Sequence, residues 1–596
     1  MNIKIKNIFS KAREVISQYP MVLVMSFIAT LSAITLMEIS SYNSEDFPLV
    51  KILLLSLLGI SLFFGIKMAS QRVGKWWLLE ISGVIILAIL YFILPNSEKD
   101  FTEVYVILMF IVFLLSHLLV SFSAFLKQNH EKRFWNFNEH LFINIFQTAV
   151  FTAVLVGGIE LAILAVANLF DFDITYKTYN EVFYIFGIFG STFIFLLFNE
   201  HGLSDLEKED EYPVVLKFFT QFILIPLLLI YAIILYFYAA KILINWELPR
   251  GWVSYLILAY SVVGIFALLL VHPLKQETSK SWVKIFSKIF YFALVPLLVL
   301  LFIAIFTRIL EYGYTELRYI VLLLALWLTS VVLYHIIFKK STIKFIPISL
   351  FCFALFAIVF PYLNAFSVAK RSQKSQLTEI LIKNKLLENG KINFKQKISS
   401  KIVDEIKDKI SFLAIRNEQA FILKLINEKQ QTKIAEIIKD KSKYTIENDI
   451  SSEFTNSSST TENLKQNYSI ISSSKFYEIV GYDYMINWGE WGNLRQVISV
   501  NGDEFKIIND LNNSKPKYLL VLNDKTELDF SNYILKVIST QTSSKNNIYV
   551  PKLEAEGIIG NYQAKLVFDE IIIYKQSKTK KNINIRNVTV FLKKIN

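Results

Sequence analysis

The sequence is poor in the residues on which soluble enzymes and secreted scaffolds depend. Its 596 residues include one cysteine, Cys352, which cannot form an internal disulfide, and six unclustered histidines. Only 19% of the residues are charged, against about 25% in an average soluble domain. Because 54% are hydrophobic and the mean hydropathy is +0.44, the composition excludes a disulfide scaffold, a disordered chain and a cytosolic enzyme.

Short motifs through which enzymes hold cofactors are also missing from the sequence. It contains no glycine-rich phosphate loop, no nucleophile elbow and no zinc-ligand spacing. We therefore assign no catalytic, cofactor-binding or metal-binding residue, expect no cofactor, and favour a protein that is not an enzyme.

Long apolar runs fill the first 366 residues and are absent from the last 230. A crossing needs about 20 apolar residues and must be helical, because lipid offers no partner to an unpaired backbone group. We predict a polytopic α-helical membrane protein with about eleven transmembrane helices and a C-terminal exported α+β soluble domain. The predicted crossings are 21–39, 49–67, 77–95, 104–126, 145–169, 182–199, 217–240, 252–271, 287–308, 318–338 and 346–363.

The distribution of lysine and arginine predicts the orientation. With a cytoplasmic N-terminus, the segments predicted inside hold 19 of these residues and the outside loops hold 7, as the positive-inside rule requires. An odd number of crossings then places the C-terminal 230 residues outside the cytoplasm.

The chain is expected to have five parts. The first is a basic start that fits either a short amphipathic helix on the inner leaflet or a flexible segment. The parts are 1–20 (cytoplasmic start), 21–366 (transmembrane domain), 367–450 (exported helical segment), 451–467 (Ser/Thr/Asn-rich linker) and 468–596 (exported β-rich module).

Within the exported part, periodicity separates helices from strands. Helical spacing predicts a helix over Ser400–Ile415, and Asn389-Gly390 is expected to end the helix before it. Asn501-Gly502, between two alternating segments, predicts a β-hairpin. The strands predicted, in a mostly antiparallel module, are Gln496–Val500, Asp503–Ile508, Tyr518–Leu522, Asn547–Val550, Ala564–Tyr574 and Asn584–Leu592.

The basic excess lies almost entirely in the C-terminal part. Residues 367–596 hold 36 Lys and Arg against 26 Asp and Glu. This charge suits anionic lipid headgroups or an anionic envelope polymer, or it simply keeps the domain soluble. Besides membrane lipid, we expect an envelope protein or anionic polymer as partner, and no nucleic acid.

Two stretches at the edge of the membrane region resemble a known family. Ala365–Gln373 contains a serine-x-x-x-arginine-serine-glutamine element, and Arg308–Tyr319 contains tyrosine-glycine-x-threonine-x-x-arginine. Both are similar to motifs of the bacterial multi-pass membrane family called domain of unknown function 4153. The resemblance implies a protein of the bacterial inner membrane, hence a periplasmic C-terminal domain, and it implies no activity.

These stretches also supply most of the candidate functional residues. In the first interpretation, Arg308–Tyr319 is a short helical hairpin whose ends are tied by Arg–Glu pairs, with Gly313 in the turn and Thr315 as a helix cap. In the second, its polar cluster grips a carboxylate or phosphate through arginine forks. The candidates are Arg308, Glu311, Tyr312, Gly313, Thr315, Glu316 and Arg318, with Ser367, Arg371, Ser372 and Gln373 from the later stretch.

Glu160 is the sharpest single residue, since it is predicted near the middle of the fifth crossing. A carboxylate at that depth is costly and often functional. Gly157-Gly158 just before it would let another helix approach closely, and His117 or Lys217 could be its partner. The alternative is a protonated structural glutamate.

The leading prediction is an inner-membrane anchor for an exported domain that binds or scaffolds an envelope component. One alternative is a transporter or flippase of a small or lipid-linked solute, supported by Glu160 and by Pro226 and Pro296 within crossings. Another is a membrane-embedded glycosyltransferase-like enzyme, by analogy of architecture alone.

Overall fold

The fold is seen in a computed structural model in which the chain forms two compact units. One comprises Met1–Gln396 and Lys401–Thr455, and the other Lys397–Ser400 and Asn456–Asn596. The structure describes residues 2–595 apart from 40–45, 128–129, 210–211, 246–252, 277–280, 339, 397, 440–441, 455–467, 475–478, 489–496, 512–515, 541–546 and 576–580.

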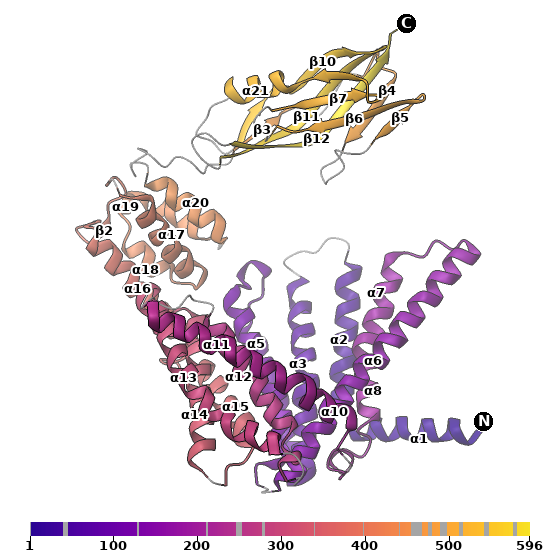
Figure 1. Ribbon diagram of the computed structural model, residues 1–596, viewed down its shortest axis with the longest axis vertical. Coiled ribbons are helices and arrows are strands. Elements are labelled where there is room, and N and C mark those ends of the chain that lie inside the picture. Colours follow the sequence, from indigo (N-terminus) through magenta and orange to yellow (C-terminus); the bar gives the residue numbers. More distant parts are fainter. Residues whose placement is uncertain are drawn as a thin grey trace. The chain divides into compact units, whose positions relative to one another are not determined.

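The first unit is built on a bundle of apolar helices (Figure 1). In the described part of the chain, ten helical segments are long and apolar enough to cross a membrane, and the eleventh predicted crossing corresponds to the shorter apolar helix α15 (Phe345–Val359). The ten contain α2 (Pro20–Glu38), α3 (Phe47–Val73), α4 (Trp76–Ile93), α5 (Glu103–Phe122) with η3 (Ser123–Phe125), α6 (Glu131–Phe170), α7 (Tyr176–Tyr184) with η4 (Ile185–Gly190) and α8 (Ser191–Leu197), α10 (Val214–Phe218) with η5 (Phe219–Leu224) and α11 (Ile225–Asn245), α12 (Val253–Leu270), α13 (Ser281–Tyr312) and α14 (Glu316–Ile337).

Short elements connect these helices or precede them. The N-terminal α1 (Asn2–Gln18) is helical and runs across the bundle axis in Figure 1, which agrees with the helical interpretation of the basic start. The connecting elements are η2 (Glu98–Asp100), α9 (Leu203–Leu206) and η6 (Pro273–Gln276).

Contacts between loops confirm the predicted alternation of the chain through the bundle. At one end, Lys11 Nζ lies 2.6 Å from Glu200 Oε1, and Leu203 N–H donates to Gln71 Oε1 at 2.9 Å. At the same end, Ile343 N–H donates to Glu131 Oε1 at 2.9 Å, and Trp135 Nε1 to Leu269 O at 2.7 Å. The segments that touch here are those predicted to share the cytoplasmic side, so the parity of the crossings is consistent throughout.

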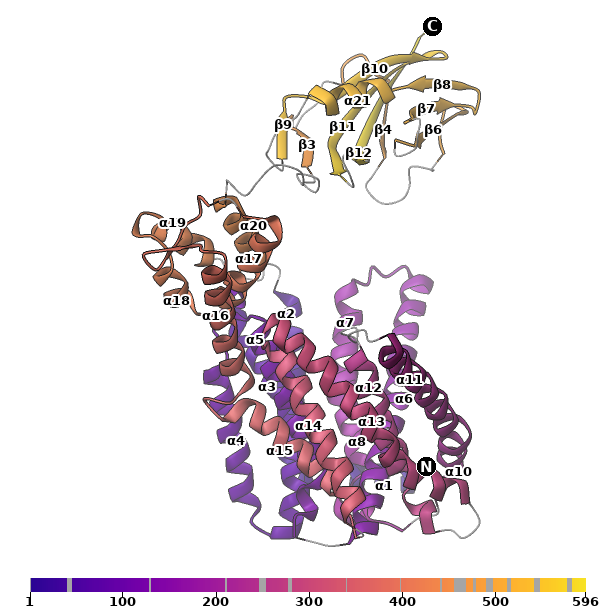
Figure 2. The same cartoon turned by 60° about the vertical axis from the view of Figure 1, so that its left-hand side comes forward.

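Beyond the bundle, the first unit ends in a cluster of C-terminal helices (Figure 2). We call α16 (Ala365–Lys383), α17 (Ser400–Ile415), α18 (Gln419–Lys424), α19 (Glu428–Lys439) and α20 (Lys443–Glu453) the platform. The predicted helix Ser400–Ile415 is confirmed at both ends. The prediction that Asn389-Gly390 ends a helix is wrong, because α16 ends earlier, at Lys383. The pair, with φ of 51° and 74°, instead forms the turn between β1 (Leu387–Glu388) and β2 (Lys391–Ile392).

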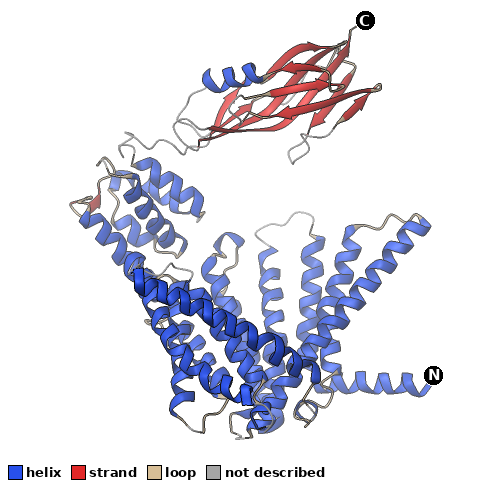
Figure 3. Ribbon diagram, viewed as in Figure 1, coloured by secondary structure: helices blue, strands red, loops and turns tan. Residues whose placement is uncertain are grey.

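In its described residues, the second unit is a β module with one helix, α21 (Ser531–Thr540), shown in Figure 3. A six-stranded sheet has the order β4-β12-β11-β3-β9 with β10 also on β11, and a second sheet has the order β5-β6-β7-β8. Every pair is antiparallel except β3 with β9, as the sequence predicted. The strands are β3 (Tyr468–Ser472), β4 (Tyr484–Trp488), β5 (Ile498–Val500), β6 (Asp503–Asn509), β7 (Tyr518–Leu522), β8 (Thr526–Asp529), β9 (Asn547–Val550), β10 (Glu554–Ile559), β11 (Tyr562–Lys575) and β12 (Lys581–Lys594).

The predicted hairpin at Asn501-Gly502 is confirmed. Both turn residues have positive φ, and Val500 pairs with Asp503, which is the geometry that an Asn-Gly turn favours. One hydrophobic core, which includes Phe505, Trp488 and Tyr562, joins the two sheets.

Candidate functional site

The α13–α14 turn is a polar hairpin whose ends are set by a glycine and a threonine. Gly313 has φ of +73°, and its N–H donates to Ile309 O at 2.8 Å, so glycine ends α13 in the left-handed conformation that other residues avoid. The Thr315 hydroxyl accepts from Arg318 N–H at 3.5 Å and caps α14. The predicted roles of Gly313 and Thr315 are thus confirmed.

The structure brings the two sequence motifs together in one place. The Ser372 hydroxyl accepts from Tyr314 N–H at 2.8 Å, and Gln373 Nε2 donates to Tyr312 O at 3.1 Å and to Tyr314 O at 2.7 Å. Gln373 is 1% exposed. A Cβ on Gly313 would lie 2.9 Å from Ser372 Oγ, so only glycine permits this approach. We call Tyr312–Thr315 with Ser372 and Gln373 the junction.

A buried ion pair joins the same hairpin to the platform. Arg416 Nε and Nη2 lie 2.6 and 2.9 Å from the two carboxylate oxygens of Glu316, and the side chains are 5% and 2% exposed. The guanidinium also lies 3.4 Å from the Phe412 ring centroid. This bidentate geometry is the strongest that arginine makes with a carboxylate.

This pair corrects the expectation that Arg–Glu pairs tie the hairpin ends to each other. Glu316 pairs with Arg416, the residue that follows α17, and among the described residues no ion pair joins Glu311 to Arg308 or Arg318. Sequence reasoning missed Arg416, although it lies three residues after Leu413 and so continues the buried stripe of α17.

A buried lysine of the platform adds a further contact. Lys409 Nζ lies 3.4 Å from Tyr312 O and 3.6 Å from Asp408 Oδ2. Burial lowers the pKa of the Lys409 ammonium below its ordinary value. Tyr312 O therefore faces donors from α14, α16 and α17, and hydrogen bonding at this one carbonyl couples bundle and platform.

Arg308 and Arg318 approach the hairpin at Tyr312. Arg318 Nη1 donates to Gly313 O at 2.9 Å and to Tyr312 O at 3.3 Å. The guanidiniums of Arg308 and Arg318 lie 5.6 and 5.4 Å from the Tyr312 ring centroid, within cation–π range. Both arginines line a pocket of about 220 Å³.

Ser367 and Arg371 have local roles at the start of α16. Ser367 N–H donates to Asn364 Oδ1 at 2.7 Å, so Asn364, which the sequence analysis did not single out, is the cap. Arg371 Nη2 donates to Tyr362 O at 2.5 Å, and its guanidinium lies 4.7 Å from the Tyr362 ring centroid.

Glu160 stands apart from this cluster, in α6. It is half-buried, and among the described residues it has no hydrogen bond or ion pair. The close helix approach expected at Gly157 and Gly158 is wrong, because nothing lies within 4 Å of where a Cβ would stand on either glycine. His117, one suggested partner, instead places Nδ1 2.8 Å from Phe113 O in its own helix.

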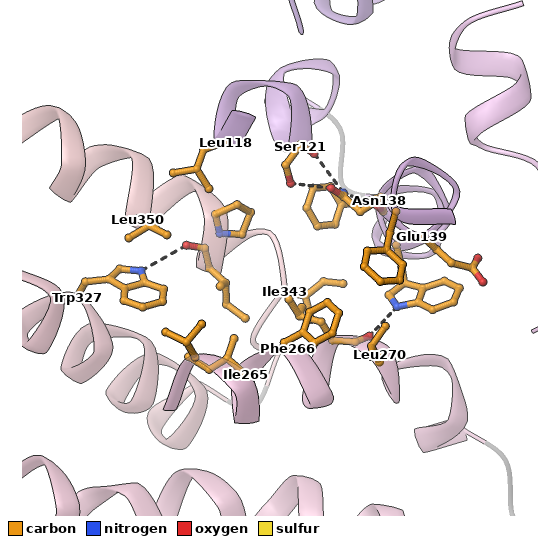
Figure 4. Close-up of a pocket in the computed structure, with 17 residues that line it drawn as sticks. Leu118, Ser121, Asn138, Glu139, Ile265, Phe266, Leu270, Trp327, Ile343 and Leu350 are labelled. Carbon is orange, nitrogen blue, oxygen red and sulfur yellow. Dashed lines mark hydrogen bonds between the residues drawn. The ribbon is translucent and has the colours of Figure 1, made fainter. Parts of the chain in front are cut away.

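A larger apolar cavity lies between α5, α6, α12, α14 and α15, away from all the predicted site residues (Figure 4). Its volume is about 370 Å³. Trp327 and Glu139 lie toward opposite sides in this view, and the Ser121 hydroxyl donates to Asn138 Oδ1 at 2.7 Å. The cavity thus pairs a mostly apolar lining with a few polar groups.

The fold defines a polytopic helical membrane protein with a C-terminal soluble domain. The chain belongs to the family described as domain of unknown function (DUF4153), whose model matches residues 21–396. It is 28% identical over 241 residues to the uncharacterized protein PM1469 of Pasteurella multocida (strain Pm70). That match covers 40% of this chain and 38% of the relative, so the chain spans well under half of the relative's length. No solved structure matches the chain.

Proposed function

We propose that the membrane bundle is an anchor that holds the platform in a fixed orientation, so that the C-terminal part binds or scaffolds a component of the bacterial envelope. The observation that carries this proposal is the Glu316–Arg416 pair beside the junction. Buried ionic and polar contacts add little net stability, but they penalise every arrangement that leaves them unpaired. They suit an interface whose geometry matters.

The proposed location is the inner membrane, with the platform end of the bundle outside the cytoplasm. Its support is the excess of lysine and arginine in the segments of the opposite end, 19 against 7. The basic surplus of residues 367–596 then favours an anionic envelope polymer or an acidic envelope protein as partner.

Sidedness is tested by cysteine accessibility in intact cells. In a Cys352→Ser background, Ser452→Cys on α20 and Lys340→Cys at the opposite end offer exposed positions. An impermeant maleimide should label the first and spare the second. The reverse pattern would place the platform in the cytoplasm and reject the envelope partner.

Partner binding is tested by crosslinking and affinity capture of the tagged full-length protein from its own membranes. We expect the same envelope component from the wild type and from Lys407→Met, which breaks only an i,i+3 pair on α17. Arg416→Met should reduce its recovery, because the platform loses its fixed attachment. Repeated capture with no envelope component, or equal capture by all three proteins, would reject the scaffold.

A second candidate function is a transporter or flippase of a small or lipid-linked solute, favoured by the 370 Å³ cavity within the bundle. Ile343 lines it and is 6% exposed, whereas Ile337 is 64% exposed. Scrambling of a fluorescent lipid in proteoliposomes that is abolished by Ile343→Trp and unaffected by Ile337→Trp would support this function. If the wild type does not scramble lipid, lipid flipping is rejected as its function.

A further inference from the structure

The pocket beside the hairpin has a charged mouth and an apolar floor. Arg308 of α13, Arg318 of α14, and Ser254 and Tyr255 in the first turn of α12 form its polar part. Ala304, Ile305 and Val321 complete the lining. These three lie one turn farther into the bundle than the arginines, because α13 runs toward this end and α14 runs away from it.

Neither guanidinium has an ion-pair partner among the described residues; the Asp408 carboxylate acts on Arg318 from beyond ion-pair distance and is itself paired with Lys409 and Lys443. Among the described residues, Arg308 has no acidic partner, and its one specific contact is the Tyr312 ring. Only Nη1 of Arg318 hydrogen-bonds to the hairpin carbonyls, and no hydrogen bond of its Nε or Nη2 is seen among the described residues. Two cations held near one ring repel each other, and an anion between them would relieve that repulsion.

The depth of the pocket indicates which anion is available. The arginines lie in the last turns of α13 and the first turn of α14, where a spanning helix meets the headgroup layer. Lipid phosphates are concentrated in this layer, and arginine forks match the geometry of phosphate oxygens. The apolar floor lies toward the hydrocarbon, where a lipid tail begins.

We infer that Arg308 and Arg318, with the first turn of α12, bind the phosphate group of a membrane lipid, whose tail begins over Ala304, Ile305 and Val321. This inference does not rest on the proposed scaffold function. It assigns to the hairpin a ligand site lined by Arg308 and Arg318, while Ser372, Gln373 and Arg416 serve attachment.

The test is native mass spectrometry of the full-length protein, delipidated in detergent and titrated with phosphatidylglycerol or with diacylglycerol of the same chains. We expect phosphatidylglycerol to bind, and Arg308→Gln to weaken this binding about tenfold, as loss of a charged hydrogen bond implies. Arg371→Gln is the matched control, because Arg371 is an exposed arginine at the same end that stacks on Tyr362 outside the pocket. Arg308→Lys should give an intermediate loss.

Each outcome bears on the inference. Equal binding of the two lipids, or equal losses from Arg308→Gln and Arg371→Gln, would overturn it. Displacement of phosphatidylglycerol by millimolar inorganic phosphate would overturn the lipid as the ligand and assign the site to a soluble phosphate. Arg318 is not substituted because it also closes the hairpin. Unchanged melting of Arg308→Gln would show that reduced binding is not unfolding.

Discussion

The sequence contains two polar segments in the membrane region, and in the structure one makes many contacts whereas the other makes few. The α13–α14 hairpin is surrounded by partners: Gly313 touches α16, and Glu316 is buried against Arg416. The Gly157–Glu160 segment of α6 has open space over both glycines and no described partner for its carboxylate. In this protein, polar residues at the end of an apolar helix indicate where another part of the chain attaches. The lone carboxylate in the middle of α6 does not, because no described residue of the same chain pairs with it.

The largest loss of stability is expected from substitution of the buried Arg416, which tests the hairpin side of this comparison. Arg416→Met leaves the Glu316 carboxylate buried without its partner, and we expect unfolding to become easier by about 3–5 kcal/mol. Thermal unfolding of the purified protein in detergent measures it. Lys407→Met, from a partly exposed i,i+3 pair on α17, should cost no more than about 0.5 kcal/mol. Similar losses from both would mean that the Glu316–Arg416 pair is not formed.

Alanine substitutions at the glycines of the two segments should change the stability in opposite directions. Gly313→Ala adds a Cβ at positive φ, 2.9 Å from Ser372 Oγ, and should destabilise by about 2–3 kcal/mol. Gly157→Ala places a methyl group in open space on a helix and should stabilise by up to about 1 kcal/mol. The melting temperatures of the two variants should therefore move in opposite directions. A loss for Gly157→Ala would mean that another surface covers α6.

The sequence was informative where local chemistry decides the structure. The helix Ser400–Ile415, the turn at Asn501-Gly502 and the cap at Thr315 follow from periodicity, backbone preference and hydrogen bonding among near neighbours. The spanning helices follow from apolar length.

Long-range pairing could not be deduced in the same way. The sequence indicated that Glu316 needs a cation and offered two nearby arginines, yet the partner lies 100 residues away. Likewise, Asn389-Gly390 fits both a helix end and a hairpin turn, and only the strands on either side decide between them. Pairing depends on tertiary packing, which one sequence without its relatives does not reveal.

A smaller effect concerns the charged contact between α16 and the start of α18. Burial alone would raise the pKa of the Glu418 carboxyl, but hydrogen bonds from Lys374 and Lys370, at 2.6 and 3.1 Å, lower it below its ordinary value. The stability gained is present above the unfolded-state pKa and is lost as the pH falls through the lower folded-state value. Between pH 7 and pH 3 we expect the wild type to lose up to about 1 kcal/mol more than Glu418→Gln. Parallel pH profiles in thermal melts would contradict this.

The smallest effect is expected at Glu160, where the contrast is sharpest. Glu160→Gln removes a charge that no described residue balances, so no pairing energy is lost and the melting temperature should stay within about 0.5 kcal/mol of the wild type. Gln373→Leu is the comparison, since it takes donors from Tyr312 O and Tyr314 O and should cost about 1–3 kcal/mol. If Glu160→Gln matched that loss, its carboxylate would have a partner beyond the single chain, such as a second copy or a bound cation. Glu160 would then again be a candidate functional residue, as its predicted depth in the membrane first suggested.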